Sequence, residues 1–469
     1  MKANRGYPQV IITAKGERAL AGGHPWVYEG EVVEVTGAGG AADAREAAGA
    51  AGSAPGERRA ALENGCLVDV LSRKGRYLGT GLYSAQSKIR VRIISRNAND
   101  CFNEAFWERK VRWAWEHRRA VMGGSSGVGS SMGAGAGEDL TCCRLIFSEA
   151  DGFPGLIADR FNDVVVTQTL SIGMERCKPA IFAALTRVLT EDGVELRGIY
   201  ERNDVSTRRL EGLDETCGWH VNDAPAPLPA DNPAAASFGP TMTEICENGV
   251  RYHVDFARGQ KTGFFLDQKY NRRAVARLAH GRRVLDCFTH TGSFALNAAL
   301  GGAEHVHAVD ISELAVDMAR ENAELNGLAD RMSFEAVNVF DLLPELEREG
   351  GHRGRVSETM AAHGGPFDFI ILDPPAFTKS RRTIDAAERG YHEINQRAMK
   401  ILPRGGYLAT CSCSHFMDTG RFRRMLASAA HDANVQLRQI EERQQAPDHP
   451  IVWGIPETDY LKFFLFQVV

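Results

Sequence analysis

Residues 284–294 read VLDCFTHTGSF, and they indicate the fold of the C-terminal half. The apolar run at 284–287 predicts a buried strand, small residues form a turn after it, and a helix is expected to begin at Ser293. Such a turn lets a nucleotide-like ligand approach the backbone at the carboxyl end of a strand. The stretch lacks the full GxGxxG pattern, which disfavours a dinucleotide. Taken alone, it is also compatible with an ordinary strand-to-helix turn.

Strand and helix patterns alternate around this stretch. Short apolar runs predict strands at 283–287, 305–309, 332–336, 369–372 and 407–410, and helices are expected at 293–300, 313–326 and 396–402. This alternation is typical of a parallel α/β sheet. We therefore expect an α/β domain over residues 237–469, with a polar insertion at 345–365.

Acidic residues end two of these strands. Asp310, in HAVDIS at 307–312, lies about 24 residues after Asp286. An acidic side chain at the end of the second strand can accept hydrogen bonds from both ribose hydroxyls of a nucleoside. A helix N-cap is the alternative for Asp310 taken alone, but the two motifs at this spacing favour ligand binding.

Two further motifs follow the later strands. FIILDPPAF at 369–377 delivers Asp373 to the carboxyl edge of the sheet, where the prolines stiffen the chain; a rigid carboxylate there can hold a planar, nitrogen-bearing substrate. GGYLATCSCS at 405–414 places Cys411 and Cys413 on one face if the backbone stays extended. Free cysteines are usually small core residues, but two at the mouth of a site are candidate nucleophiles.

A fifth motif precedes the first strand. Residues 259–268 read GQKTGFFLDQ, with two glycines, an aromatic pair and several polar groups. This composition fits either a lid over a small ligand or an ordinary amphipathic loop.

The N-terminal half divides into two parts. Residues 1–98 predict small all-β structure, with strands at 67–71, 77–83 and 88–94 and an Ala/Gly-rich insertion at 37–61. Residues 99–236 predict an α+β domain, with helices at 104–120 and 175–189, a strand at 164–170, a low-complexity stretch at 123–138 and a Pro-rich boundary at 224–233.

Composition excludes several classes of protein. The 469 residues carry a formal net charge of -5, so a nucleic-acid partner would need a local basic patch. Ten scattered cysteines, without CxxC pairs or a Cys/His cluster at zinc spacing, predict no metal site and a reducing cytoplasm. No apolar run approaches the roughly 18 residues of a transmembrane helix, and the first ten residues lack the apolar core of a signal peptide. We therefore expect a cytoplasmic protein without membrane partners.

A local basic patch is present near the N-terminus. Residues 63–97 contain seven basic side chains against two acidic ones. Arg90 and Arg92 alternate along a predicted strand, which would aim both at phosphates. The candidate RNA-binding residues are Arg73, Lys74, Arg90 and Arg92; a solvated strand face is the alternative.

The C-terminal half resembles class I S-adenosylmethionine-dependent methyltransferases, and nearly the whole chain resembles the RlmI-type bacterial large-subunit rRNA cytosine-C5 methyltransferases. The resemblance rests on these segments: HPWV at 24–27, SEADGFPGL at 148–156, GQKTGFFLDQ at 259–268, DCFTHTGSF at 286–294, DPPAF at 373–377, SCS at 412–414, HP at 449–450 and YLK at 460–462. It implies a small N-terminal PUA domain with a β-barrel fold that binds RNA, a middle domain that helps to form the substrate cleft, and a Rossmann-like catalytic domain.

The resemblance also implies site residues. Those expected to bind S-adenosylmethionine are Lys261, Thr262, Phe264, Gln268, Asp286, Thr291, Gly292, Phe294, Asp310, Asn338 and Asp373. Asn338 stands where relatives often have Asp beside the adenine, and its carbonyl oxygen can still accept a hydrogen bond. The partner implied is large-subunit ribosomal RNA, and a homodimer is compatible with the resemblance.

The implied chemistry begins with a thiolate. Carbon 5 of cytosine is a poor nucleophile, and addition of a thiolate to carbon 6 makes the ring able to attack a methyl group. Cys413 is the expected nucleophile, and Cys411 is the alternative. Asp373 would hold the edge of the ring that carries N3 and the exocyclic amine. Many RNA cytosine methylases carry a second cysteine after the Asp-Pro-Pro turn; here Ala376 takes that place, as in the RlmI-type family. The base that removes the carbon 5 proton is not identified.

Two other functions stay open. An Asp-Pro-Pro turn also serves methylation of exocyclic amines of guanine or adenine, for which no thiol is needed. The chain could instead be a non-catalytic RNA-binding factor in ribosome assembly, although the intact set of Asp286, Asp310, Asp373 and Cys413 argues against this.

Overall fold

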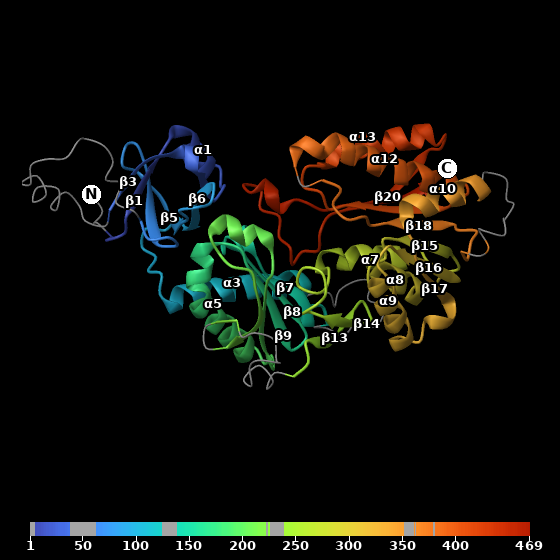
Figure 1. Cartoon of the computed structure of the whole chain (residues 1–469), viewed down its shortest axis with the longest axis horizontal. Helices are drawn as coiled ribbons and strands as arrows, with labels where there is room; N and C mark the ends of the chain where they lie inside the picture. The colour runs from blue at the N-terminus through green and yellow to red at the C-terminus, as the bar shows by residue number, and fades with distance from the viewer. Residues whose placement is uncertain are drawn as a thin grey trace, which may run out of the picture.

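Three β-sheets follow one another along the long axis of the molecule (Figure 1). The computed structural model describes residues 5–37, 62–123, 138–221, 224–225, 239–350, 361, 363–378 and 380–469. Nearly all of the insertions expected at 37–61 and 123–138, and most of the Pro-rich boundary at 224–233, lie outside the described residues.

The first sheet has six strands in the order β2-β6-β5-β4-β1-β3. Their bounds are Gln9–Ile12 for β1, Trp26–Tyr28 for β2, Val32–Thr36 for β3, Leu67–Ser72 for β4, Tyr77–Tyr83 for β5 and Ile89–Ser95 for β6; helix α1 spans Ala14–Ala21. Every second residue of β1 is buried, because side chains alternate across a strand: Val10 and Ile12 point into the core. The predicted strands at 67–71, 77–83 and 88–94 are confirmed.

The second sheet has the order β12-β11-β10-β9-β8-β7 and carries long helices on one side. The strands are Cys142–Phe147 (β7), Leu156–Phe161 (β8), Val164–Thr169 (β9), Gly198–Asn203 (β10), Thr216–Val221 (β11) and Ala224–Pro225 (β12), and the helices are Glu104–Met122 (α3), Glu138–Thr141 (α4) and Ile172–Glu191 (α5). The helix predicted at 175–189 begins earlier, because Ser171 Oγ accepts a hydrogen bond from the backbone N–H of Met174 and caps it.

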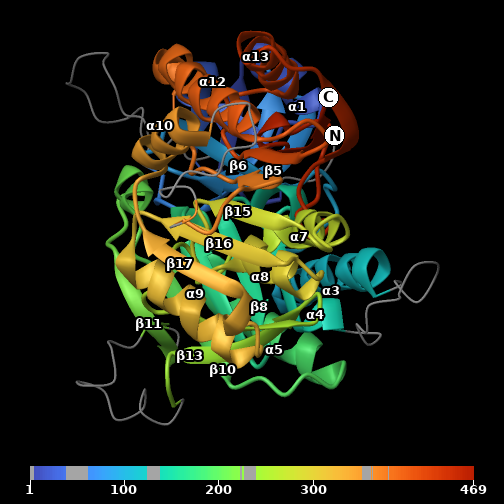
Figure 2. The same ribbon diagram turned by 90° about the vertical axis from the view of Figure 1, so that its right-hand side faces the viewer.

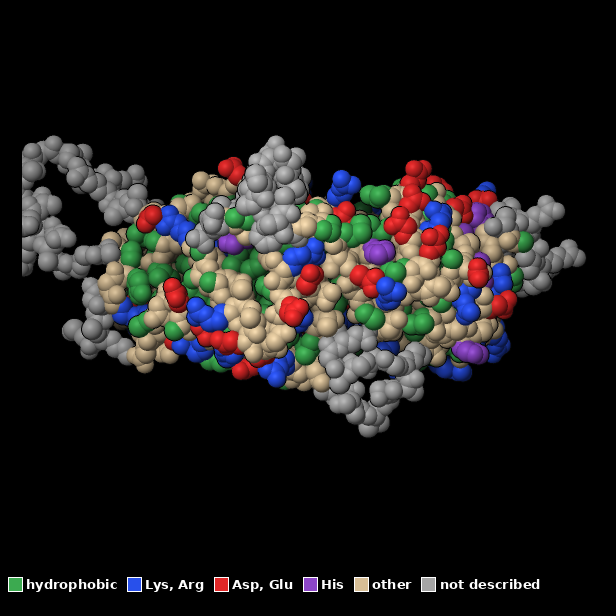
Figure 3. Space-filling view, turned by 90° about the horizontal axis from the view of Figure 1, so that it is seen from below, with side chains coloured by type: hydrophobic (Ala, Val, Ile, Leu, Met, Phe, Trp, Pro, Cys, Tyr) green, Lys and Arg blue, Asp and Glu red, His purple; other side chains and the backbone are tan. Residues whose placement is uncertain are grey.

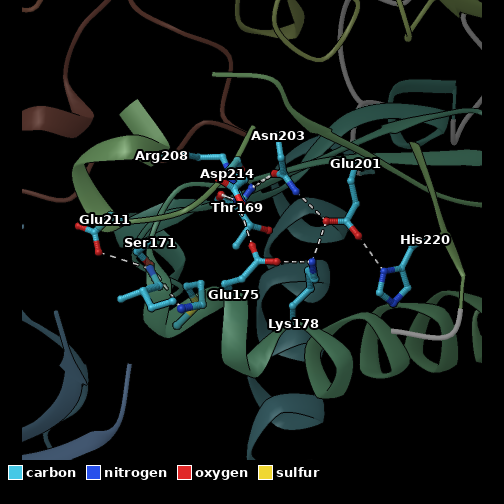
Figure 4. A network of polar contacts seen from close by, with 12 residues as sticks. Thr169, Ser171, Glu175, Lys178, Glu201, Asn203, Arg208, Glu211, Asp214 and His220 are labelled. Carbon is cyan, nitrogen blue, oxygen red and sulfur yellow. Dashed lines mark hydrogen bonds and ion pairs between the residues drawn. The ribbon is translucent and has the colours of Figure 1, made fainter. Parts of the chain in front are cut away.

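A buried polar network crosses this second sheet (Figure 4). Glu201 on β10 lies at its centre and is fully buried. Its carboxylate accepts from Asn203 Nδ2 at 2.7 Å and pairs with Lys178 Nζ at 3.0 Å and His220 Nδ1 at 2.8 Å. A buried carboxylate needs such partners, since an unpaired charge in the interior is costly.

The third sheet has seven strands in the order β17-β16-β15-β18-β19-β21-β20, of which only β21 runs antiparallel to both of its neighbours. The strands are Arg283–Cys287 (β15), His305–Asp310 (β16), Met332–Ala336 (β17), Phe369–Leu372 (β18), Tyr407–Ser412 (β19), Leu437–Arg443 (β20) and Lys462–Val468 (β21). The five strands predicted here are confirmed, and this is the Rossmann-like part of the chain. The order reverses between β15 and β18, which is where ligands bind in open α/β sheets.

Helices cover both faces of the third sheet (Figure 2). Helices α7 (Lys269–Ala276), α8 (Ser293–Leu300) and α9 (Glu313–Leu325) lie on one face, and α10 (Val339–Gly350), α12 (Ile384–Ile401) and α13 (Thr419–Asp432) lie on the other. Helix α12 starts well before the predicted 396–402, because Ala387, Tyr391 and Ile394 continue its buried stripe at helical spacing. Helix α10 occupies the start of the insertion expected at 345–365; residues 351–360 and 362 lie outside the described residues.

A hairpin of β13 (Met242–Glu247) and β14 (Val250–Asp255) joins the second sheet to the third. Tyr200 and Trp219 of the second sheet pack in one hydrophobic cluster with Tyr252, Phe256 and Phe264. The middle and C-terminal parts therefore share a core. None of the described helices is both long and apolar enough to cross a membrane.

Candidate active site

Four candidate side chains meet at one edge of the third sheet. Asp286 and Asp310 stand at the ends of β15 and β16, Asp373 directly follows β18, and Cys413 directly follows β19. These strands are mutually parallel, so their carboxyl ends lie together. The sequence motifs thus converge in space as the parallel sheet predicts.

The loop after β15 has an unusual backbone. Phe288 and His290 adopt φ values of 62° and 52°, a region that costs energy for residues other than glycine, and Gly292 has φ 83°. This conformation brings the N–H of His290 to 3.0 Å from Asp310 Oδ2, while the N–H of Ser312 donates to Oδ1, also at 3.0 Å. The Asp310 carboxylate is therefore fixed in place and keeps lone pairs for further donors.

Asp286 is fully buried at the end of β15. Its Oδ2 accepts from Thr289 Oγ1 at 2.6 Å and from the N–H of Ala295 at 2.9 Å. Burial raises its pKa to about 7, and the charge of Asp373 adds to this effect. Within the described part of the chain, Asp286 Oδ1 and Thr291 Oγ1 are buried without a hydrogen-bond partner. Orphaned polar atoms beside a strained loop fit a site that takes a polar ligand.

Gly292, Phe294 and Asn338, which are also expected at the cofactor site, differ from one another in burial and in contacts. A Cβ on Gly292 would lie 3.0 Å from Ala319 Cβ, so this turn has no room for a side chain. Phe294 is buried in the core and stacks on Phe463 with ring centroids 6.5 Å apart. Asn338 accepts from the N–H of Phe340 and donates to Asp341 Oδ2 at the start of α10. Phe294 therefore supports the loop from behind, whereas Asn338 is only half-buried at the sheet edge.

Asp373 is held by two neighbours. Gln268 Nε2 donates to Asp373 Oδ1 at 2.9 Å, and the thiol of Cys411 also hydrogen-bonds to this carboxyl. Asn271 in turn donates to Gln268 Oε1 at 2.6 Å, which fixes the amide orientation. Burial, with the charge of Asp267, raises the pKa of Asp373 to about 6. This carboxyl can therefore be protonated or ionised near neutral pH.

The two cysteines differ in accessibility. Cys411 is fully buried in the core cluster, and burial raises its pKa well above the usual value. Cys413 is only half-buried. Burial and the charge of Asp373 raise its thiol pKa to about 11, against the opposing charges of Lys261 and Lys462. Cys413 is thus the thiol that a substrate can reach.

The segment 259–268 bridges the middle part and the catalytic edge. Thr262 is buried, and its hydroxyl donates to Asp159 Oδ2 at 2.6 Å. Arg202 Nη1 donates to the carbonyl of Gly259 at 2.9 Å. Phe264 packs in the shared core against Tyr252. The segment expected as a lid is therefore anchored at both ends.

A cavity of about 470 Å³ opens beside this segment. Its lining comes from both parts: Arg144, Gln168 and Arg202 from the middle, and Lys261, Asp267 and Tyr460 from the C-terminal part. Lys261 is exposed, with Nζ 4.6 Å from the centre of the Phe265 ring. A wider depression of about 980 Å³ over α13 and β20 has none of these residues in its lining.

The candidate RNA-binding residues separate into two pairs. Arg73 and Lys74 are exposed in the turn between β4 and β5. Arg90 Nη2 lies 2.5 Å from Glu29 Oε1, and Arg92 Nη2 lies 2.8 Å from Glu211 Oε1 of the middle part. Both guanidiniums are largely buried and already neutralise carboxylates, which differs from the expectation that they aim together at phosphates.

Charges of both signs are interspersed on one face of the molecule. On the face drawn in Figure 3, basic and acidic side chains alternate along the described residues without a continuous basic patch. Nonspecific attraction of an RNA backbone by this face is therefore weak.

Two residues at the site, Tyr460 and Lys462, lie in the YLK segment of the resemblance, but the sequence assigns no role to them. Lys462, at the start of β21, is buried and donates to the carbonyls of Ser414 and Tyr460, each at 2.7 Å. Burial lowers its pKa to about 8, although the nearby Cys413 thiol opposes this shift. Asp267 accepts from Tyr460 Oη at 2.6 Å. Lys462 and Tyr460 come from the antiparallel strand β21 and the tail before it, so only the fold brings them to the site.

Comparisons with known proteins agree with this geometry. A family described as S-adenosylmethionine-dependent methyltransferase matches residues 236–466, and a PUA-like domain matches residues 10–96. Relatives named ribosomal RNA large subunit methyltransferase I are 36% identical in Erwinia tasmaniensis, over 98% of this chain and 99% of the relative, and 33% identical in Klebsiella pneumoniae, over 99% of each.

Solved structures show the same fold over the full length. A chain from Streptococcus mutans, described as an S-adenosylmethionine-dependent methyltransferase, superposes with a TM-score of 0.69 at 21% identity, covering 98% of this chain and 100% of that one. A methyltransferase structure that contains SAH gives a TM-score of 0.71 at 20% identity, with the same coverage. The protein is an S-adenosylmethionine-dependent methyltransferase with a PUA-like N-terminal domain, and it belongs to the ribosomal RNA large subunit methyltransferase I family.

Proposed function

We propose that the protein methylates carbon 5 of a cytosine in large-subunit ribosomal RNA, with Cys413 as the nucleophile. The observation that carries this proposal is a reachable thiol beside a carboxyl of raised pKa at the carboxyl edge of the sheet. The names of the full-length relatives and the PUA-like match support the RNA substrate. The ten cysteines, all within the described residues, form no disulfide, which supports the proposal of a cytoplasmic enzyme.

S-adenosylmethionine supplies an electrophilic methyl group when it is bound. The residues that fit its polar groups are the fixed Asp310 carboxylate, the orphaned Asp286 Oδ1 and Thr291 Oγ1, and the tight turn at Gly292. Asn338 would offer its side chain at the neighbouring strand end. Lys261 would approach from the exposed side of the anchored segment.

The chain's own residues would perform the chemistry on the base. Cys413 gives its proton to water and adds through sulfur to carbon 6, so that electron density moves to carbon 5 and N3. Asp373 in its neutral form donates a hydrogen bond to N3, where negative charge grows, and a pKa of about 6 leaves part of this carboxyl neutral. Carbon 5 bonds to the methyl group and its proton passes to water, after which the bond between sulfur and carbon 6 breaks and the thiolate leaves.

The competing functions are less well supported. Methylation of an exocyclic amine leaves no task for the thiol of Cys413. A purely binding role leaves no task for the orphaned acceptor of Asp286 or the raised pKa of Asp373.

We also propose a division of labour along the chain. Residues 1–98 would bind RNA, residues 99–236 would form one wall of the substrate cleft, and residues 237–469 would carry out catalysis. The lining of the 470 Å³ cavity by both later parts supports this division. Arg73 and Lys74 are the exposed basic residues that would contact phosphates.

A methyl-transfer assay tests the reaction class. Purified protein is incubated with labelled S-adenosylmethionine and naked large-subunit rRNA, and the digested nucleosides are identified by mass spectrometry. We expect 5-methylcytidine from the wild type and from Cys101→Ala, a matched exposed-cysteine control, and none from Cys413→Ala. Methylated guanosine or adenosine, or a product unchanged in Cys413→Ala, would overturn the proposal.

A further inference from the structure

Three potential metal ligands converge at the outer strands β16 and β17 of the third sheet. His307 on β16, Glu335 on β17 and His363 place their ligand atoms within 4.8 Å of one another. Glu335 Oε2 lies 3.1 Å from His307 Nε2 and 2.7 Å from His363 Nδ1. The strand register explains the first contact: His307 pairs with Ser333 and Val309 with Glu335, so these side chains lie on one face of the sheet.

The surroundings of His307 fix its ring. The ring is buried and stacks on Phe367, with centroids 6.2 Å apart and 18° between the planes. Its Nδ1 lies 2.8 Å from Ser333 Oγ, which is also 2.8 Å from His305 Nε2. A hydroxyl can accept one hydrogen bond and donate another, so Ser333 Oγ can accept a hydrogen bond from the Nδ1–H of His307. His307 Nε2 then carries its lone pair on the side of Glu335, and a hydrogen bond from the other ring nitrogen is the arrangement of metal-binding histidines.

We propose that His307 Nε2, the Glu335 carboxylate and His363 Nδ1 bind one divalent transition-metal ion, for which Zn²⁺ is the best match. Two neutral imidazoles and one carboxylate are a ligand set that zinc accepts, with water at the fourth position. Zinc bonds of about 2.0–2.2 Å place tetrahedral ligand atoms roughly 3.3 Å apart. The two separations from Glu335 Oε2, 2.7 and 3.1 Å, are close to this value, and all three ligand atoms lie within 4.8 Å of one another.

Two of the three proposed ligands are open to solvent. Glu335 and His363 are partly exposed, with 35% and 16% of the side chain accessible, so an ion can reach them from solvent. The metal would replace the hydrogen bonds that Glu335 makes with the two rings.

The role of this site is structural. His307 precedes Asp310 by three residues on the same strand, a separation of about 10 Å at the usual rise of a strand. The site would fasten the chain at His363 to the outer strand β17, and so support the strand that ends in Asp310. It does not depend on which base the enzyme methylates.

Metal titration of the chelator-treated, full-length protein tests the site. We expect one Zn²⁺ to bind per chain and to raise Tm by several degrees. His363→Ala and Glu335→Gln should each weaken binding at least tenfold and abolish the rise in Tm. His431→Ala, which removes a histidine with 88% of its side chain exposed, should leave both unchanged. Methyl transfer in the metal-free variants at low temperature should stay near the wild-type rate.

Cobalt distinguishes this site from the cysteines. Co²⁺ in the site should give visible d–d bands without the strong near-ultraviolet absorption of thiolate ligands, and His363→Ala should remove the bands. Absence of stoichiometric binding, binding that persists in both variants, or thiolate absorption from the bound cobalt would each overturn the proposal.

Discussion

Cys413 has a thiol that the folded protein keeps protonated. Burial is the largest cause of its raised pKa, the Asp373 charge adds to it, and Lys261 and Lys462 act in the opposite direction. Because only the thiolate attacks, the free enzyme should hold this residue in an unreactive state at neutral pH. Reactivity would then arise when substrate changes the surroundings of the sulfur.

The pH dependence of alkylation measures this state. With a thiol pKa of about 11, the thiolate fraction of Cys413 rises about tenfold per pH unit between pH 7 and 10, and the alkylation rate should follow it. Iodoacetamide modification of the Cys413 peptide, followed by mass spectrometry, gives the rate. A plateau below pH 9 would show that the thiol is far more acidic than its surroundings imply.

Asp373→Ala tests the role of the carboxyl. Alanine removes the side chain that would donate a hydrogen bond to N3, whereas asparagine would still offer an N–H donor. We expect kcat to fall by about 10²–10³-fold, the usual cost of losing one donor to developing charge, with folding unchanged. Single-turnover methyl transfer measures the rate, and circular dichroism checks the fold. A loss below threefold would contradict a role in the chemical step.

At the scale of single residues, the sequence identified the strand-end groups and little else. The predicted strands end at or next to four candidate residues, Asp286, Asp310, Asp373 and Cys413. Because the strands of a parallel sheet end at one edge, the sequence predicts that these side chains lie together. Lys462 lies 49 positions after Cys413, on a strand of opposite direction, and no local pattern joins the two. Arg90 and Arg92 carry the right charge for phosphates, but their partners Glu29 and Glu211 are visible only in the fold.

At the scale of elements, alternation of apolar runs was enough to predict the parallel strands. The sequence does not predict the first part of α12, because Gly390 and several charged residues interrupt its apolar pattern. The buried face of this part is recognisable only once the helix packs on the sheet. From the sequence alone, residues 259–268 are equally compatible with a lid and with an ordinary loop. In the fold, the hydroxyl of Thr262 donates a hydrogen bond to Asp159, about a hundred positions away in sequence, and this contact anchors the segment.

The buried network of the second sheet should control the stability of β10. Glu201→Ala removes one of the two carboxylates that pair with the buried Lys178, together with the acceptor of Asn203 Nδ2, and breaking a buried ion pair typically costs about 3–5 kcal/mol. Urea denaturation followed by tryptophan fluorescence measures the loss. Glu191→Ala removes a partner of Arg112 in an exposed ion pair and should cost far less. Similar losses in the two variants would contradict the central role of Glu201.

The same network predicts a dependence on acid. Burial alone would raise the pKa of Glu201, but the His220 hydrogen bond and the Lys178 charge hold it below the usual 4.5. The stabilisation is therefore complete above pH 4.5 and is lost as the pH falls through the lower, folded-state value. The difference between wild type and Glu201→Ala should narrow in acid; a constant difference down to pH 2 would contradict this cause.

At the scale of the whole molecule, the parts are joined by ion pairs as well as by a shared core. Arg92 of the first sheet pairs with Glu211, and Arg118 on α3 donates to the carbonyl of Asp448 in the C-terminal tail at 2.7 Å. The PUA-like domain is thus fastened to the middle part, so RNA bound at the proposed turn of Arg73 and Lys74 would approach the cleft from a fixed direction.

Salt dependence tests where RNA contacts this assembly. Arg73→Ala/Lys74→Ala should weaken RNA binding and reduce the slope of log affinity against log salt by roughly 1–2, as expected for two lost phosphate contacts. Lys15→Ala, on α1 of the same domain, removes an exposed charge and should change the slope little. Fluorescence anisotropy at several salt concentrations gives both slopes. Equal slopes for the double variant and the wild type would exclude these two residues from the interface.

The most direct test of the whole scheme is a covalent trap. RNA whose cytosines carry fluorine at carbon 5 can accept the thiolate and the methyl group, but fluorine cannot leave as a proton does, so the protein stays attached. We predict a denaturant-resistant adduct, formed in the presence of S-adenosylmethionine and mapped to the peptide of Cys413, retained in Cys101→Ala and lost in Cys413→Ala. Methylation of natural RNA without any adduct, or an adduct through Cys411, would contradict Cys413 as the nucleophile.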